Sequence, residues 1–120
     1  MAASPTPGLD RFDLVAPLIF RSEGLSGLSA AVFRGVLPET ALDAAFERLE
    51  SFPITIIDGG REHRREALAI AQSLGWAKTY DAEYVALARR LSCDLLTADE
   101  RLERGAARLV TVIRPTSLAG

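Results

Sequence analysis

The chain has 120 residues, of which 48% are hydrophobic and 25% charged, a composition that fits one globular domain. Its net charge of −2 and pI of about 5.4 argue against a module that coats nucleic acid through a basic surface, although a nuclease with a carboxylate site can be acidic. Cys93 is the only cysteine, which excludes an internal disulfide and a cysteine-based zinc site. No apolar run approaches the roughly 18 residues of a membrane span, and the first residues lack the features of a secretory signal, so we expect a cytoplasmic protein with no membrane contact.

The first half of the chain predicts a tail, a strand and two helices. Residues 1–11 are small and proline-rich and are expected to form a flexible tail. The short apolar run at 14–16 predicts a strand, and Pro17 suits the first position of a helix that Gly35 ends. A second helix is expected to begin at Pro38, because the apolar residues that follow it recur at helical spacing.

The second half alternates strands and helices. A β-branched run bounded by proline and glycine predicts a strand, and later apolar runs predict two more. The expected strands are 54–57, 94–98 and 108–113, and the expected helices are 62–74 and 80–91, with a short helix or turn at 100–105. Strands separated by helical crossovers predict an α/β fold with a parallel sheet covered on both faces.

A carboxylate follows the predicted strand at 94–98. In open parallel sheets, functional sites lie beyond the carboxyl ends of the strands, which is where Asp99 is expected. Thr97, two residues earlier, is expected to point to the same side. The alternative is that Asp99 caps the turn that follows, and the local sequence leaves both roles open.

Two further acids are expected to face inward. Asp81 lies at the end of the apolar stripe of helix 80–91, although it could simply be a first-turn acid that favours the helix dipole, with Thr79 as N-cap. Glu23 lies on a helix face of small residues, although it could be an ordinary surface glutamate. Two carboxylates ~4 Å apart repel by about 4 kcal/mol at an effective dielectric of 20, and a hard cation such as Mg²⁺ or Mn²⁺ would remove that repulsion.

Other polar residues are interpreted as structural. His63 stands among Arg61, Arg64 and Arg65, which predicts a solvated helix face. Asp58 follows a strand and precedes two glycines, so we expect it to stabilise the turn.

Two blocks of the sequence resemble the C-terminal signature of PIN domains, the nucleases typified by the VapC toxins of bacterial toxin–antitoxin pairs. They are residues 80–88 (YDAEYVALA) and 93–102 (CDLLTADERL). Residues 12–17 (FDLVAP) and 21–23 (RSE) resemble the family's second strand and the helix after it. The resemblance implies a three-layer α/β/α PIN-like fold over 12–120.

The resemblance also implies an activity and partners. It implies a Mg²⁺- or Mn²⁺-dependent ribonuclease that acts as the toxin of a toxin–antitoxin pair, with an RNA substrate, a cognate antitoxin and a homodimeric state. Glu23, Asp81 and Asp99 match the family's acidic positions and would bind the metal and carry catalysis. Thr97 matches the strand-end threonine and would support Asp99.

The sequence departs from the family pattern at its start. The family opens with an apolar strand that ends in Asp and is central in the sheet, and neither Asp10 nor Asp13 ends such a strand here. We therefore expect the central strand to be missing, so that the chain is a shortened form or borrows a strand. Two other functions stay open: a PIN-like binding module without catalysis, and a phosphoacceptor of the response-receiver type. The second is disfavoured, because a receiver needs an Asp pair after its first strand.

Overall fold

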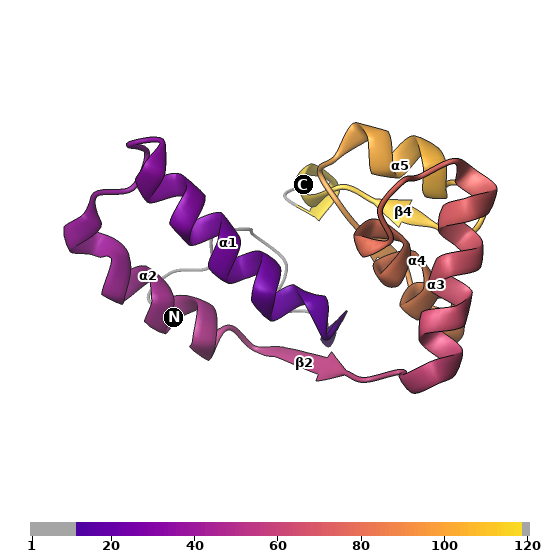
Figure 1. Cartoon of the computed structure of the whole chain (residues 1–120). Helices are drawn as coiled ribbons and strands as arrows, with labels where there is room; N and C mark the ends of the chain where they lie inside the picture. The colour runs from indigo at the N-terminus through magenta and orange to yellow at the C-terminus, as the bar shows by residue number, and fades with distance from the viewer. Residues whose placement is uncertain (1–11, 119–120) are drawn as a thin grey trace.

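The structure is a computed structural model that describes residues 12–118 (Figure 1). The expected tail at 1–11 lies outside the described residues. In chain order the elements are β1 (Leu14–Pro17), α1 (Ile19–Phe33), η2 (Glu39–Ala41), α2 (Leu42–Ser51), β2 (Ile54–Ile57), α3 (Gly60–Leu74), α4 (Tyr80–Leu91), β3 (Leu95–Leu96), α5 (Glu100–Ala106), β4 (Val112–Ile113) and η3 (Pro115–Leu118).

The strands are parallel, as the sequence predicts, but they form two small sheets. β1 pairs with β2, with Leu14 opposite Ile54, and β3 pairs with β4, with Leu95 opposite Val112. The α/β class with parallel strands is therefore confirmed. The expected single sheet is instead divided, because no strand within residues 12–118 lies between β1 and β3.

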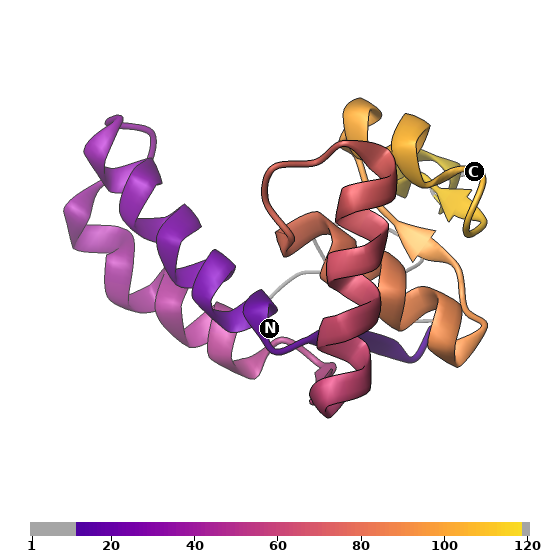
Figure 2. The same cartoon turned by 45° about the vertical axis from the view of Figure 1, so that its right-hand side comes forward.

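The main core lies around α3 and α4, which pack against each other more extensively than any other pair of elements (Figure 2). Most of the buried residues here are alanines. Ala82, Val85, Ala86 and Ala106 have no exposed surface. The rest of this core cluster is Ala67, Ile70, Ala71, Ala88, Leu95 and Leu102.

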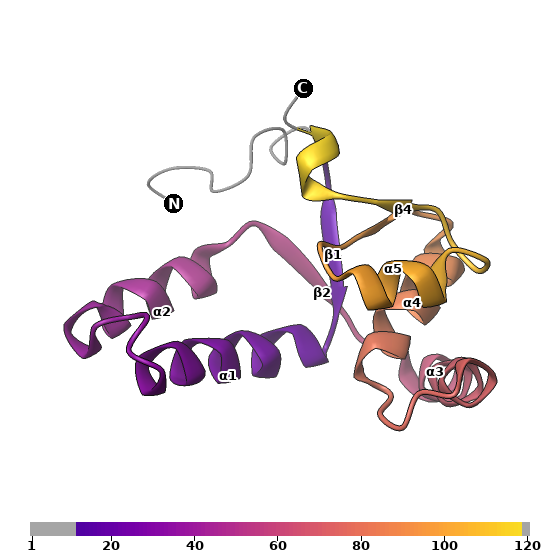
Figure 3. The same cartoon turned by 90° about the horizontal axis from the view of Figure 1, so that it is seen from above.

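A hairpin of α1 and α2 stands apart from this core (Figures 1 and 3). Neither helix has a buried residue, and the two pack through Gly24, whose added Cβ would lie 2.8 Å from Leu49 Cδ1. At the tip, Phe33 is 91% exposed and Val36 is 74% exposed. The hairpin thus keeps a large apolar surface in contact with solvent.

Helix ends are mostly where the sequence places them. Gly35, with a φ of 76°, follows α1 as its predicted stop. The expectation for Pro17 was wrong: it is the last residue of β1, and α1 begins two residues later. Pro17 lies opposite Ile57 as the last pair of the β1–β2 ladder, so the strand includes the proline and the helix begins only after it.

Candidate functional site

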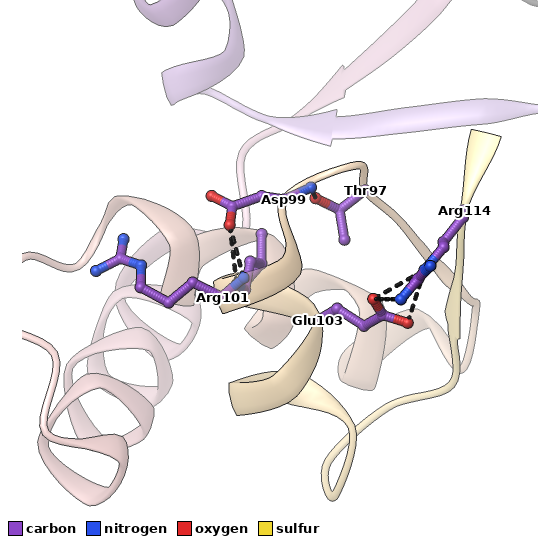
Figure 4. A network of polar contacts seen from close by, with 6 residues as sticks. Thr97, Asp99, Arg101, Glu103 and Arg114 are labelled. Carbon is purple, nitrogen blue, oxygen red and sulfur yellow. Dashed lines mark hydrogen bonds and ion pairs between the residues drawn. The ribbon is translucent and has the colours of Figure 1, made fainter. Parts of the chain in front are cut away.

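Asp99 caps α5 at the end of the β3 segment (Figure 4). Its Oδ1 accepts hydrogen bonds from the backbone N–H groups of Arg101, at 2.9 Å, and Leu102, at 3.2 Å. Its own backbone N–H donates to Thr97 Oγ1 at 3.0 Å. The capping role is therefore real. It does not exclude metal binding, since Oδ2 accepts no hydrogen bond from the described residues and a carboxylate has about four acceptor positions.

Arg101 connects Asp99 to Asp81. Besides its backbone bond to Asp99, it places Nη2 3.6 Å from Asp81 Oδ2. Its side chain is 72% exposed and that of Asp81 is 32% exposed, so this ion pair is weak. Thr79 occupies the N-cap position of α4 but makes no side-chain capping bond. Arg101 thus contacts Asp81 through its guanidinium and Asp99 through its backbone N–H.

Glu23 reaches the same region from α1. The Tyr84 hydroxyl donates a hydrogen bond to Glu23 Oε1 at 2.6 Å, across 61 positions of sequence. Tyr84 lies one helical turn after Asp81 on α4, so this bond brings the glutamate toward the helix that carries Asp81. Sequence reasoning placed Tyr84 on the apolar face and missed its hydroxyl.

Three negative charges act on the Tyr84 hydroxyl. Its pKa is raised, first by burial, then by the hydrogen bond to Glu23, and then by the charges of Glu23, Asp81 and Glu83. Burial also raises the pKa of the Glu83 carboxyl, His63 opposes that rise and Glu23 adds to it. Three carboxylates, those of Glu23, Asp81 and Glu83, therefore lie near the Tyr84 hydroxyl.

The predicted ligands are not assembled into a closed cluster. Within residues 12–118, no three His, Cys, Asp or Glu side chains form a group that could hold a metal ion. Asp81 faces Arg101, and Glu23 faces Tyr84. The donor set still suits Mg²⁺, which binds oxygen and commonly uses only one or two carboxylates with several waters.

An ion pair secures the far side of α5. Arg114, which follows β4, donates from Nε to both carboxylate oxygens of Glu103, at 2.9 and 3.1 Å. Its Nη2 lies 2.7 Å from Glu103 Oε1. This contact joins β4 to α5 and so helps to fix the helix that Asp99 caps (Figure 4).

The expectation for His63 was wrong. The side chain is only 4% exposed, and its Nε2 lies 2.8 Å from the carbonyl oxygen of Glu83. His63 precedes Ala67 by four residues and Ile70 by seven, and this spacing places it on the buried stripe of α3. Gly59 makes room for the ring, since an added Cβ at this glycine would collide with His63.

Glu23 is exposed, so the expectation that it faces inward was wrong: its face of α1 lies on the hairpin, which has no buried residue. Two other polar expectations hold. Arg61, Arg64 and Arg65 are exposed on α3, as a solvated helix face requires. Asp58 Oδ1 accepts a hydrogen bond from the N–H of Gly60 at 2.9 Å, which is the turn role expected of it.

The chain belongs to the PIN domain family, whose family model matches residues 7–108. It is 36% identical over 101 residues to ribonuclease VapC3 of Mycobacterium tuberculosis strain CDC 1551 / Oshkosh, covering 80% of this chain and 67% of that protein. Ribonuclease VapC3 of strain ATCC 25618 / H37Rv matches with the same identity and coverage. The family inferred from the sequence blocks is confirmed. Among the described helices, none is long and apolar enough to cross a membrane.

Proposed function

We propose that this protein is a Mg²⁺- or Mn²⁺-dependent ribonuclease of the PIN type that hydrolyses phosphodiester bonds in RNA. The observation that carries the proposal is the arrangement of acids on three segments around Tyr84 and Arg101. Glu23 comes from α1, Asp81 from α4 and Asp99 from the N-cap of α5, three residues after β3. Membership of the PIN family and the similarity to VapC3 ribonucleases support it.

Each site residue has its own task in this proposal. Asp81 and Asp99 would hold the cation. The Thr97 hydroxyl accepts a hydrogen bond from the backbone N–H of Asp99 and so helps to position it. Glu23 would bind through a water or orient the attacking water, and the Tyr84 hydroxyl fixes the direction of its carboxylate. A bound cation would polarise the phosphodiester and neutralise the charge that develops during hydrolysis.

The proposal includes protein partners. Toxin–antitoxin pairing and a homodimer both require exposed surface that can be buried, and the α1–α2 hairpin offers Phe33 and Val36. Action on cellular RNA would place the protein in the cytoplasm, in keeping with its single cysteine.

One observation favours the alternative of a catalytically degenerate PIN-like binding module. The described residues hold no three-membered metal-binding group, and both Glu23 and Asp81 already have partners in Tyr84 and Arg101. Such a module would keep the protein contacts of the fold and lose the chemistry.

RNA cleavage by the purified chain separates the two functions. We expect cleavage of a labelled RNA in Mg²⁺ or Mn²⁺ and none in EDTA. Asp99→Asn and Asp81→Asn should lower the rate by at least about tenfold, because asparagine loses the charge that attracts the cation. Asparagine remains a good N-cap, so Asp99→Asn should fold normally.

Asp43→Asn provides the control, because Asp43 is an exposed first-turn acid on α2 away from the site. Cleavage that persists in EDTA would contradict the metal dependence. Binding of RNA or a partner without cleavage in any metal would favour the binding module.

A further inference from the structure

Arg101 is a cation beside the acids whose side chain is only loosely held. Its Nη2 lies 3.6 Å from Asp81 Oδ2, which is longer than the range of about 2.7–3.2 Å for an N–H···O hydrogen bond. Within residues 12–118, none of its side-chain N–H groups donates a hydrogen bond, and the side chain is 72% exposed. An exposed pair of this kind adds little to stability. A structural role therefore does not account for this arginine.

Other arginines of the fold are held closely. Arg114 donates to both carboxylate oxygens of Glu103, at 2.9 and 3.1 Å, and so joins β4 to α5. Arg90 donates from Nη1 to the Gly59 carbonyl at 3.1 Å. The other two ion pairs among the described residues contain none of the acids of the proposed site. Arg101 thus combines a place beside those acids with a guanidinium whose donors are open.

The backbone of Arg101 is fixed although its guanidinium is not. Its N–H donates to Asp99 Oδ1 at 2.9 Å, and the next residue, Leu102, is 7% exposed and belongs to the core cluster. Figure 4 shows its side chain on the same side of α5 as the Asp99 carboxylate and away from the pair of Glu103 and Arg114. The guanidinium can therefore change its partner without any movement of the fold.

The charge of the substrate gives this guanidinium a task. Each phosphodiester of RNA is an anion, and in the proposed reaction it must approach the carboxylates of Glu23, Asp81 and Asp99. Like charges repel at short range, so a positive group beside those acids favours the approach. The planar guanidinium presents several N–H donors in a fork that matches two oxygens of one phosphate.

We propose that Arg101 is a substrate-binding residue that holds a phosphate of the RNA backbone beside the acids, and that it pairs with Asp81 only while neither metal nor RNA is bound. This inference rests on the proposed ribonuclease function. Asp81 would give up the contact when it coordinates a divalent cation, because that charge attracts the carboxylate and repels the guanidinium. The freed guanidinium would then face the substrate.

The first test measures binding alone. Fluorescence anisotropy of a short labelled single-stranded RNA is followed in EDTA, where the proposed cleavage does not proceed. We expect Arg101→Gln to weaken binding by at least about fivefold. It should also lower the steepness of log K against log salt concentration by about 0.7, the contribution of one phosphate contact on a single strand. Arg65→Gln, at an exposed arginine of α3, removes the same charge and should change the affinity by less than about twofold.

The second test examines the exchange of partners. Asp81→Asn removes the competing carboxylate and frees Arg101, so it should strengthen RNA binding in EDTA. This gain should be at least about threefold larger in the parent than in Arg101→Gln, because the two residues are coupled only while they form a pair. An equal gain in both backgrounds would show that Asp81 acts on RNA through its charge alone and would overturn the exchange.

RNA binding and RNA cleavage decide separate questions. Equal affinity of Arg101→Gln and the parent, an equal loss in Arg65→Gln, or a parent that binds no RNA overturns the role of Arg101. Cleavage by the parent is measured separately in Mg²⁺ and Mn²⁺. If the parent binds RNA through Arg101 but cleaves none, the ribonuclease function is wrong and the phosphate contact stands.

Discussion

The two parts of the molecule are stabilised in different ways. The part around α3 and α4 has an alanine-rich core with several residues that have no exposed surface, whereas the α1–α2 hairpin has no buried residue. Asp81 and Asp99 belong to the first part, and Glu23 belongs to the second. The proposed site therefore draws two acids from a well-packed framework and one from an arm whose position depends on few contacts.

The largest expected effect contrasts a core residue with a hairpin residue. Val85→Asp places a charge where no surface is exposed, so we expect it to destabilise the fold by more than about 4 kcal/mol or prevent folding. Phe33→Asp, at a 91% exposed position, should change the free energy of unfolding by no more than about 0.5 kcal/mol. Urea unfolding measures both. A comparable loss in the two variants would show that the hairpin tip is packed against something in solution.

The next effect concerns the cap of α5. Asp99→Ala removes the acceptor of two backbone N–H groups, so we expect a loss of about 1 kcal/mol in metal-free urea unfolding. Asp99→Asn keeps an acceptor and should stay within about 0.5 kcal/mol of the parent. If both variants lose the same stability, the charge of Asp99 and not its capping bonds is what stabilises the helix start.

An effect of similar size, confined to one helix, tests the contact between the hairpin and the part around α3 and α4. Tyr84→Phe removes the hydrogen bond to Glu23, which we expect to stabilise the placement of α1 by about 1 kcal/mol. Amide exchange in α1 should become about fivefold faster while that in α4 stays the same. Tyr80→Phe is the matched control, because Tyr80 is 48% exposed and no described residue bonds to its hydroxyl. Faster exchange in both variants would show that the contact with Glu23 is not what positions the hairpin.

The smallest effect is a loss of stability at alkaline pH that depends on the Tyr84 hydroxyl. Burial and the neighbouring carboxylates raise the pKa of Tyr84 above its ordinary value of 10.0, so the folded state holds the phenol proton more tightly than the unfolded state. The stabilisation is present below about pH 10 and is lost as the pH rises above it. Melting temperatures between about pH 8 and 11 should fall less steeply in Tyr84→Phe than in the parent. Identical slopes would contradict the raised pKa.

Local patterns predicted the elements well where the sequence marks their ends clearly or repeats apolar residues regularly. Residues 54–57 and 80–91 form β2 and α4 with the predicted bounds, because proline and glycine frame the first and a regular apolar stripe defines the second. The strands expected at 94–98 and 108–113 are shorter in the structure. Their length is set by how many residues pair with the neighbouring strand, which the local sequence does not show.

The site was less predictable than the elements. Asp99 and Thr97 follow from position at a strand end, but the contact between Tyr84 and Glu23 joins residues 61 positions apart and leaves no local pattern. The burial of His63 could have been predicted from the sequence. Its spacing from Ala67 and Ile70 indicated burial, and the neighbouring arginines outweighed that signal.

The turn between β2 and α3 has a consequence for engineering the protein. Gly59 leaves room for His63, its carbonyl accepts a hydrogen bond from Arg90 Nη1 at 3.1 Å, and His63 bonds in turn to the Glu83 carbonyl. A label or an inserted residue in this turn would therefore disturb the start of α3 and both ends of α4 together. Among residues 12–118, no hydrogen bond joins the loop around Val36 to α4, so a fluorescent probe attached there would report on the hairpin while leaving the part that holds Asp81 and Asp99 intact.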